Sequence, residues 1–255
     1  MNTHLAHEAS LNMDDHRPQG VLHNAPVAHS PDLPGAPIAL TARELEDRRL
    51  IHRNDSSRKQ ADAFRELRTR LLALGGSQNF VTMVAPVSPG CGGSFVARNL
   101  AAAFAFDDSK SALLVDCDAL HPAQQATLRV DATRGGLIDY LDERQPDLSS
   151  IIYPTGVPRL GLIPSGSQRE ITGEAFSSMR MRVLVDSLRS RYPDRYLVLD
   201  SPSALGSPDA RILSELADLV VLVAGYGKVT PEQIDKAAAS FAPEKMAGVV
   251  FNHIP

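Results

Sequence analysis

The chain has 255 residues, of which 43% are hydrophobic and 22% are charged, with a formal net charge of −4. This composition is typical of a globular protein, and the mildly acidic balance argues against nonspecific binding, so no nucleic-acid partner is expected. No apolar run approaches the roughly 20 residues that span a bilayer, and the N-terminus lacks the basic start and apolar centre of a signal peptide. With only two cysteines, the expected location is the cytoplasm.

The first part of the chain predicts a tail and two helices. Residues 1–38 are rich in Pro, His, Asn and Ala without any periodic apolar face, which predicts disorder. Residues 39–76 predict an N-terminal helical segment. Its first helix, TARELEDRRLIHR, begins with Thr41 and Glu44 at the spacing of a capping box. Its second helix, SSRKQADAFRELRTRLLALGG, ends in a glycine pair that suits a helix C-terminus.

Residues 77–255 predict an α/β domain in which apolar strands alternate with helices. The strands are expected at residues 80–85, 112–116, 159–164, 196–200, 219–224 and 247–251. Their nearly continuous apolar character is typical of strands buried on both faces. Helices between them imply right-handed crossovers, so the predicted fold class is α/β, a doubly wound and mainly parallel sheet. In such sheets the ligand binds at the carboxyl ends of the strands.

One segment, APVSPGCGGSFVARNLA, has the order of strand, glycine-rich loop and helix that a phosphate-binding loop needs. Two glycines in the loop allow a tight turn with inward N–H groups, and the helix N-terminus adds a partial positive charge. Ser94 stands where the magnesium-binding hydroxyl belongs. The expected nucleotide-binding residues are Gly90, Cys91, Gly92, Gly93, Ser94 and Phe95.

The loop departs from the phosphate-loop motif at Gly93, where a lysine is expected. That ammonium would contact the β- and γ-phosphates, a contact of about 1.5–3 kcal/mol, so its loss should weaken nucleotide binding roughly ten- to 150-fold. Catalysis should suffer more, because charge builds up in the transition state. Replacing Gly93 by lysine is expected to restore the affinity. Arg98, one helical turn after Ser94, is expected to point along the helix and away from the phosphates.

Aspartates follow two of the predicted strands. Asp116 and Asp118 end ALLVDCD, and share one side if the strand conformation continues, while Asp200 ends YLVLD. A single aspartate at a strand end is commonly a cap or turn former. Carboxylates at several strand ends beside a phosphate loop indicate instead a site that holds magnesium and orients the attacking group. The expected cofactors are therefore ATP and Mg²⁺, with weakened affinity.

Together these motifs resemble the bacterial tyrosine kinases (BY-kinases) of capsule and exopolysaccharide synthesis, within the ParA/MinD superclass of P-loop ATPases. The resemblance covers about residues 41–255. APVSPGCGGSFVARNLA resembles the family's Walker A loop, VDCDALHP its second aspartate motif, and LVLDSPSALGSPDA its Walker B strand. Asp62, Arg65 and Arg68 resemble the Glu-x-x-Arg-x-x-Arg helix that packs subunits into rings, which implies a homo-oligomer with these residues at its interface.

The resemblance also implies roles for the site residues. Ser94 and Asp200 would hold magnesium, Asp116 would help to activate the substrate hydroxyl, and Asp118 would support the metal site. Leu120 lies where the family usually has an arginine. The tyrosine-rich C-terminal tail that these kinases autophosphorylate is not found, since Tyr226 is the only tyrosine after residue 200.

Loss of the lysine and of the tail predicts a pseudokinase or a weakly active regulatory subunit. In the family the kinase binds the cytoplasmic tail of a membrane polysaccharide co-polymerase of the Wzz type. That partner would place this chain at the inner face of the plasma membrane. Two alternatives remain open at this point: an active ATP-dependent tyrosine kinase with a substitute cation, and a positioning ATPase of the ParA/MinD type.

Overall fold

The computed structural model describes residues 39–52, 58–167 and 173–253. The predicted disordered tail, residues 1–38, lies outside this described part, so its disorder stays a prediction.

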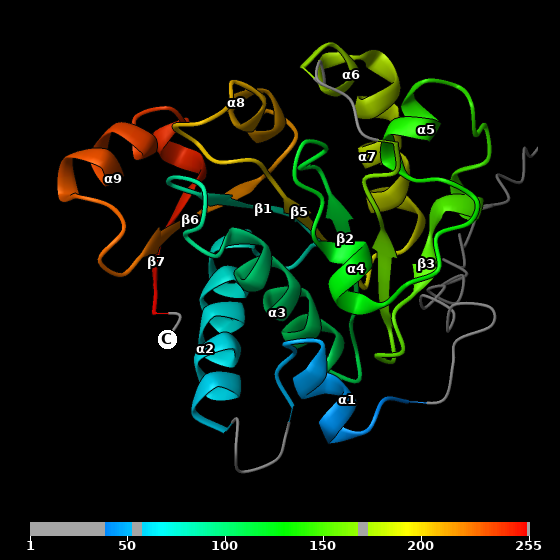
Figure 1. Cartoon of the computed structure of the whole chain (residues 1–255), viewed down its shortest axis with the longest axis horizontal. Helices are drawn as coiled ribbons and strands as arrows, with labels where there is room; N and C mark the ends of the chain where they lie inside the picture. The colour runs from blue at the N-terminus through cyan, green and yellow to red at the C-terminus, as the bar shows by residue number, and fades with distance from the viewer. Residues whose placement is uncertain (1–38, 53–57, 168–172, 254–255) are drawn as a thin grey trace, which may run out of the picture.

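A mainly parallel sheet runs through the described part of the chain, with seven strands in the order β3-β4-β2-β5-β1-β6-β7 (Figure 1). All six predicted strands are present, and they pair in parallel with their neighbours. The sequence patterns missed only β3, a two-residue strand antiparallel to β4, which is too short to show a period. The strands are β1 Val81–Pro86, β2 Ser111–Asp116, β3 Tyr153–Pro154, β4 Leu160–Ile163, β5 Arg195–Asp200, β6 Leu219–Gly225 and β7 Met246–Asn252.

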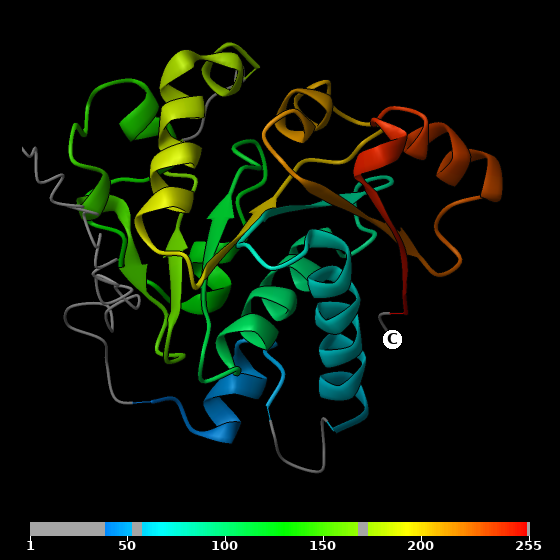
Figure 2. The same cartoon turned by 180° about the vertical axis from the view of Figure 1, so that it is seen from behind.

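Helices cover both faces of the sheet, as a doubly wound fold requires (Figures 1 and 2). The helices are α1 Ala42–Asp47, α2 Arg58–Gly75, α3 Gly93–Ala105, α4 Gln124–Leu128, α5 Leu137–Leu141, α6 Gly173–Ser177, α7 Met179–Arg191, α8 Asp209–Ser214 and α9 Pro231–Ala238. Buried side chains of α2, α3 and α4 form one core with one face of the strands. Those of α5 to α9 form a second core with the opposite face. The fold class predicted from the sequence is therefore confirmed.

The local signals of the N-terminal helices are also confirmed. In α1 the Thr41 hydroxyl accepts from the Glu44 N–H, and the Glu44 carboxylate accepts from the Thr41 N–H at 2.9 Å. The helix ends at Asp47, earlier than its sequence pattern suggested, because Arg49 takes a left-handed conformation with φ of 53°. The chain then turns so that Leu50 and Ile51 enter the core beside α3.

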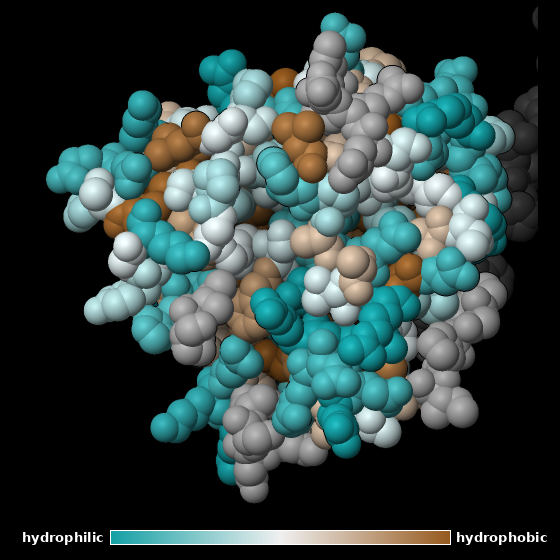
Figure 3. Space-filling view, in the orientation of Figure 1, coloured by the Kyte–Doolittle hydropathy of each residue, from teal (hydrophilic) through white to brown (hydrophobic). Residues whose placement is uncertain are grey.

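The surface shows no extended apolar area on the side drawn in Figure 3, where hydrophilic residues predominate and apolar ones form small separate areas. Across the described residues, no helix has both the length and the apolar character needed to cross a membrane.

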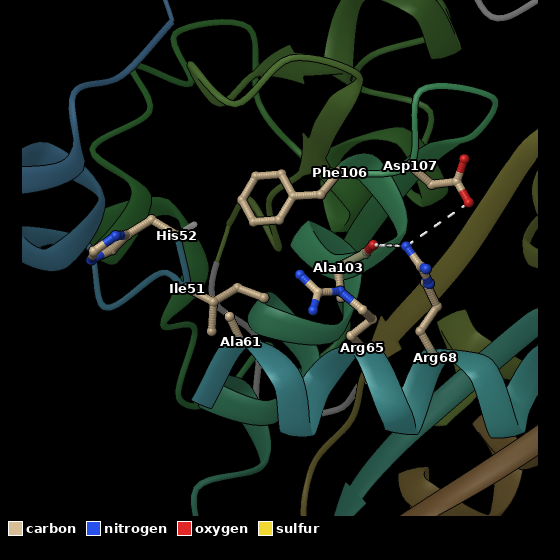
Figure 4. A pocket seen from close by; sticks show the side chains of 8 residues that line it. All are labelled: Ile51, His52, Ala61, Arg65, Arg68, Ala103, Phe106 and Asp107. Atoms are coloured by element: carbon tan, nitrogen blue, oxygen red, sulfur yellow. Dashed lines mark hydrogen bonds and ion pairs between the residues drawn. The ribbon is translucent and has the colours of Figure 1, made fainter. Parts of the chain in front are cut away.

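The helix that carries the predicted oligomer residues, α2, packs beside α3, and a cavity of about 170 Å³ lies at this junction (Figure 4). Arg68 Nη1 donates to the Ala103 carbonyl oxygen at 2.9 Å and lies 3.9 Å from the Asp107 carboxylate. Its side chain is only 17% exposed. Arg65 is 58% exposed and pairs with Asp62 of its own helix. The structure therefore uses Arg68 within the chain and leaves Arg65 at the surface.

We predict that Arg68→Ala and Arg65→Ala have different effects. Loss of the Arg68 contact should cost about 1.5–3 kcal/mol, which lowers Tm by roughly 3–10 °C. Arg65→Ala should change stability by less than about 0.5 kcal/mol, yet shift any self-association through this helix toward monomer in sedimentation. Equal stability of the two variants would show that the Arg68 contact contributes nothing, and an oligomer unchanged by Arg65→Ala would remove this helix from the interface.

Candidate nucleotide site

The carboxyl ends of β1, β2 and β5 meet at one edge of the sheet. Asp116 and Asp200 are register partners on β2 and β5, and Val84 of β1 is the partner of Asp200 on the other side. The glycine-rich loop follows β1 and leads into α3. Parallel pairing thus brings the predicted loop and two of the predicted aspartates to one place, although they are far apart in the sequence.

The loop has the backbone shape that its glycines predict. Gly90 and Gly92 both take left-handed conformations, with φ of 80° and 87°, which only glycine adopts without strain. The Cys91 carbonyl accepts from Asn252 Nδ2 at 3.0 Å, and the Val87 N–H donates to the Val223 carbonyl at 2.9 Å. The N-cap residue of α3 is Gly92, which has no side chain that could accept hydrogen bonds from the first N–H groups of the helix. Such a helix start favours an anion.

Gly93 is buried in the first turn of α3, against the ring of Pro86. A Cβ atom at this position would lie 2.6 Å from Pro86 Cδ and 2.8 Å from Pro86 Cγ. A lysine side chain therefore cannot start from this backbone unless Pro86 moves. The expectation that lysine at position 93 restores affinity needs correction for this reason, because the loop has lost the space as well as the side chain.

A lysine from another part of the chain reaches the loop. Lys228 follows β6, and its Nζ donates to the Gly90 carbonyl oxygen at 2.9 Å. Sequence reasoning placed no lysine at the loop, because 138 positions separate these two residues. Only the pairing of β1 with β6 brings them together. The ammonium is exposed at the rim of the loop.

Asp116 and Asp200 are both buried at the strand ends. Asp116 Oδ2 accepts from the N–H groups of Ala123 and Gln124, at 3.2 and 3.0 Å. Burial, and then the charge of Asp200, raise the pKa of Asp116 well above its ordinary value. Burial likewise raises the pKa of Asp200 to about 6, opposed by hydrogen bonds from Gln124 and Ser94.

Asp118 does not share this environment. β2 ends at Asp116, and the Asp118 N–H turns back to Asp116 Oδ1 at 3.3 Å, so the strand conformation does not continue. The Asp118 carboxylate is partly exposed and accepts from the His121 N–H at 3.0 Å. Leu120, where the resemblance led us to expect an arginine, is exposed. Asp118 therefore lies at the edge of the site, where its charge still acts on Asp116 and Asp200, and its role at a metal stays a prediction.

Arg98 lies elsewhere than its sequence position suggested. Its guanidinium is buried and turns back toward the start of α3, where Nη1 contacts the Ser94 carbonyl at 3.3 Å and Gln124 Oε1 at 3.1 Å. The physical reason is that helical side chains lean toward the helix N-terminus. Burial lowers the pKa of Arg98 to about 10, while the charges of Asp200 and Asp116 oppose this, so the guanidinium remains charged at neutral pH.

Gln124, the first residue of α4, is a site residue that the sequence patterns missed altogether. Its side-chain amide Nε2 donates to Asp200 Oδ2 at 2.6 Å and to the Ser94 carbonyl at 2.9 Å. A buried glutamine after an irregular loop has no motif of its own. Its place between two strand ends and α3 is set by the tertiary structure.

Magnesium prefers oxygen ligands in an octahedral arrangement. Ser94 and Asp200 lie together as that role requires, and Asp200 Oδ1 is buried with no hydrogen-bond partner among the described residues. However, Asp200 Oδ2 is held by Gln124, and the nearby guanidinium of Arg98 already supplies positive charge. The residues present therefore do not fit a divalent cation unless Gln124 and Arg98 rearrange.

The curated proteins that are similar to this chain include bacterial tyrosine-protein kinases. No protein-family model matches the chain. The tyrosine-protein kinase wzc of Salmonella typhimurium is 32% identical over 196 residues, which cover 76% of this chain and 27% of the relative. The tyrosine-protein kinase CpsD of Streptococcus agalactiae is 26% identical over 217 residues, which cover 84% of this chain and 91% of the relative. The homologues of this chain are bacterial tyrosine-protein kinases.

Solved structures agree with this relationship. The BceF tyrosine kinase domain is 26% identical, with a TM-score of 0.69 over 86% of this chain and 92% of that domain. The cell division ATPase MinD of Pyrococcus furiosus shares the fold alone, at 20% identity and a TM-score of 0.57 over 68% of this chain and 70% of MinD. The chain spans about a quarter of the Salmonella kinase and nearly all of the Streptococcus kinase, so the activity of the whole relatives is not carried over by homology alone.

We predict that Gly93→Lys alone does not restore nucleotide affinity, and that it lowers stability because the new side chain meets Pro86. The double variant Pro86→Ala with Gly93→Lys should regain ATP binding roughly ten- to 150-fold over the wild type, measured by calorimetry without added metal. Pro86→Ala alone is the matched control. Strong ATP binding by the single variant Gly93→Lys at unchanged Tm would contradict this reading of the loop.

Proposed function

We propose that this chain is a pseudokinase of the BY-kinase type. It would act as an inactive or weakly active regulatory subunit of capsule or exopolysaccharide synthesis. The observation that supports this most directly is the buried contact of Gly93 with Pro86, which fills the space where the loop lysine starts. Phosphoryl transfer depends on positive charge at the transferred phosphate, so a loop without that lysine loses much of its catalytic power.

The loop's backbone supports retained but weakened nucleotide binding. Its two left-handed glycines and the helix start without a side-chain cap form a cradle of N–H groups that does not require the lysine. ATP bound there would contact residues 90–95, and its affinity would be reduced by the missing ammonium. When bound, nucleotide would act as a structural or signalling ligand.

For the partner, we propose the cytoplasmic tail of a Wzz-type membrane polysaccharide co-polymerase. The kinase-like region makes up about a quarter of the Salmonella relative but nearly the whole Streptococcus relative. In the Streptococcus relative the kinase-like region is thus nearly the whole chain, which supports docking as the way in which such a region meets the rest of the polysaccharide machinery. Docking of this kind would place the protein at the inner face of the plasma membrane.

A specific observation favours a second candidate, a weakly active ATP-dependent tyrosine kinase. Lys228 places an ammonium 2.9 Å from the Gly90 carbonyl and could supply the cation that Gly93 does not. A positioning ATPase has only the shared fold with MinD in its favour.

The proposed function predicts that Asp116→Asn, which removes the proposed catalytic carboxylate, leaves polysaccharide production intact. Cells that lack the gene should lose polymer, and both wild type and Asp116→Asn should restore it, because the role is docking and not phosphoryl transfer. Purified wild type should form no phosphotyrosine with Mg-ATP and should bind a peptide of the co-polymerase tail. The proposal fails if the wild type phosphorylates tyrosine and a folded Asp116→Asn variant cannot restore polymer.

The role of Lys228 is tested by Lys228→Ala, with Lys236→Ala on α9 as the matched control. If Lys228 faces the phosphates, its loss should lower ATP affinity roughly ten- to 150-fold while Lys236→Ala has no effect. Equilibrium dialysis with labelled ATP measures both. Equal affinities for the two variants would leave Lys228 as a tie that only holds the Gly90 carbonyl.

A further inference from the structure

We propose that Arg98 and Gln124 form an internal counter-charge that replaces a divalent cation at the strand-end carboxylates, so that the site is stable without metal and closed to it. In this arrangement the positive charge of Arg98 balances the negative charge of the buried carboxylates. This inference extends the proposed function, but it is tested without nucleotide, kinase activity or partner.

Gln124 connects the two carboxylates with Arg98. Its backbone N–H donates to Asp116 Oδ2 at 3.0 Å, and its side-chain amide donates to Asp200 Oδ2 at 2.6 Å. Its remaining polar atom, Oε1, accepts from Arg98 Nη1 at 3.1 Å. One buried residue thus contacts both carboxylates and the guanidinium, and joins β2, β5 and α3 into a single hydrogen-bonded network.

Arg98 supplies the charge of this network. It is the only charged residue of α3, whose other side chains from Val96 to Ala105 are apolar apart from Asn99. A buried charge is costly unless it is paired, and the charges of Asp200 and Asp116 are the favourable ones that act on Arg98. Arg98 as a whole is 3% exposed, so solvent provides little of this compensation.

The same charge works against a metal ion. A divalent cation between Ser94 and Asp200 would lie close to the buried guanidinium, and like charges repel strongly where water is excluded. The ion would also have to displace the Gln124 amide if it were to use Asp200 Oδ2. Both costs are avoided if Arg98 and Gln124 take the place of the cation, and the hydrogen bonds of Gln124 to Asp116, Asp200 and Arg98 support this arrangement.

The experiment compares thermal unfolding in EDTA and in millimolar MgCl₂, at matched ionic strength. Wild type should have the same Tm in both. Arg98→Met, which keeps most of the side-chain volume, leaves two buried carboxylates without their counter-charge, so Tm should fall by about 10 °C. Magnesium should then recover much of this loss, because the freed site can accept the ion.

Two further variants make the test specific. Arg180→Met is the control for loss of an arginine away from the carboxylates: the Arg180 side chain is 30% exposed and donates to the Tyr140 carbonyl at 2.8 Å. It should show no gain from magnesium. The double variant Arg98→Met with Asp116→Asn removes the guanidinium together with one of the two carboxyl groups and should be more stable than Arg98→Met alone.

Three results would overturn the proposal. One is a Tm of the wild type that rises with magnesium in the absence of nucleotide, which would show an open metal site. Another is an Arg98→Met variant as stable as Arg180→Met, which would show that the guanidinium is not needed. If Arg98→Met does not fold, the double variant decides: its failure to fold as well would assign Arg98 to packing, not to charge balance. None of these results bears on phosphotyrosine formation, so failure here is distinct from failure of the proposed function.

Discussion

Two carboxylates lie buried side by side at the ends of neighbouring parallel strands, and much of the surrounding structure compensates for them. Asp116 and Asp200 are paired in register, so their charges act on each other in a region that water hardly reaches. Burial of this kind is unfavourable unless donors and positive charge surround the carboxylates. The first turn of α4 directs N–H groups at Asp116, and α3 contributes Arg98 through Gln124. Apolar packing holds both helices on the sheet, and their polar groups at this edge compensate the two carboxylates.

The glycine-rich loop keeps its shape for a separate reason. Its conformation depends on left-handed glycines and on ties to the neighbouring β6 and β7 side of the sheet, through Lys228 and Asn252. None of these contacts involves the side chain at position 93. The loop backbone can therefore keep its shape with glycine at position 93. Packing of Pro86 against Gly93 then makes the loss hard to reverse.

The site contains two positively charged side chains, although neither belongs to the position where a phosphate loop carries its lysine. In place of a lysine within the loop, an exposed ammonium lies at its rim on Lys228 and a buried guanidinium lies behind it on Arg98. The first faces solvent and a possible ligand, whereas the second faces the carboxylates. This separation agrees with a protein that has kept the architecture of its kinase homologues for a role in which phosphoryl transfer is not the main task.

The sequence by itself determined the parallel sheet, the succession of strands and helices along the chain, the capping box at Thr41 and the glycine turn of the loop. These features depend on short-range periodicity and on backbone preferences of single residues, which are visible without the fold. It also identified Asp116 and Asp200, because strand ends are readable and parallel strands end at one edge. Only the tertiary structure decided which residues surround them. Contacts such as Lys228 with Gly90 or Gln124 with Asp200 join positions 138 and 76 residues apart, and no local pattern encodes them. The direction of the Arg98 side chain and the closeness of Pro86 to Gly93 likewise follow from packing. Both depend on which atoms surround these residues in the fold, and the sequence alone does not specify those neighbours.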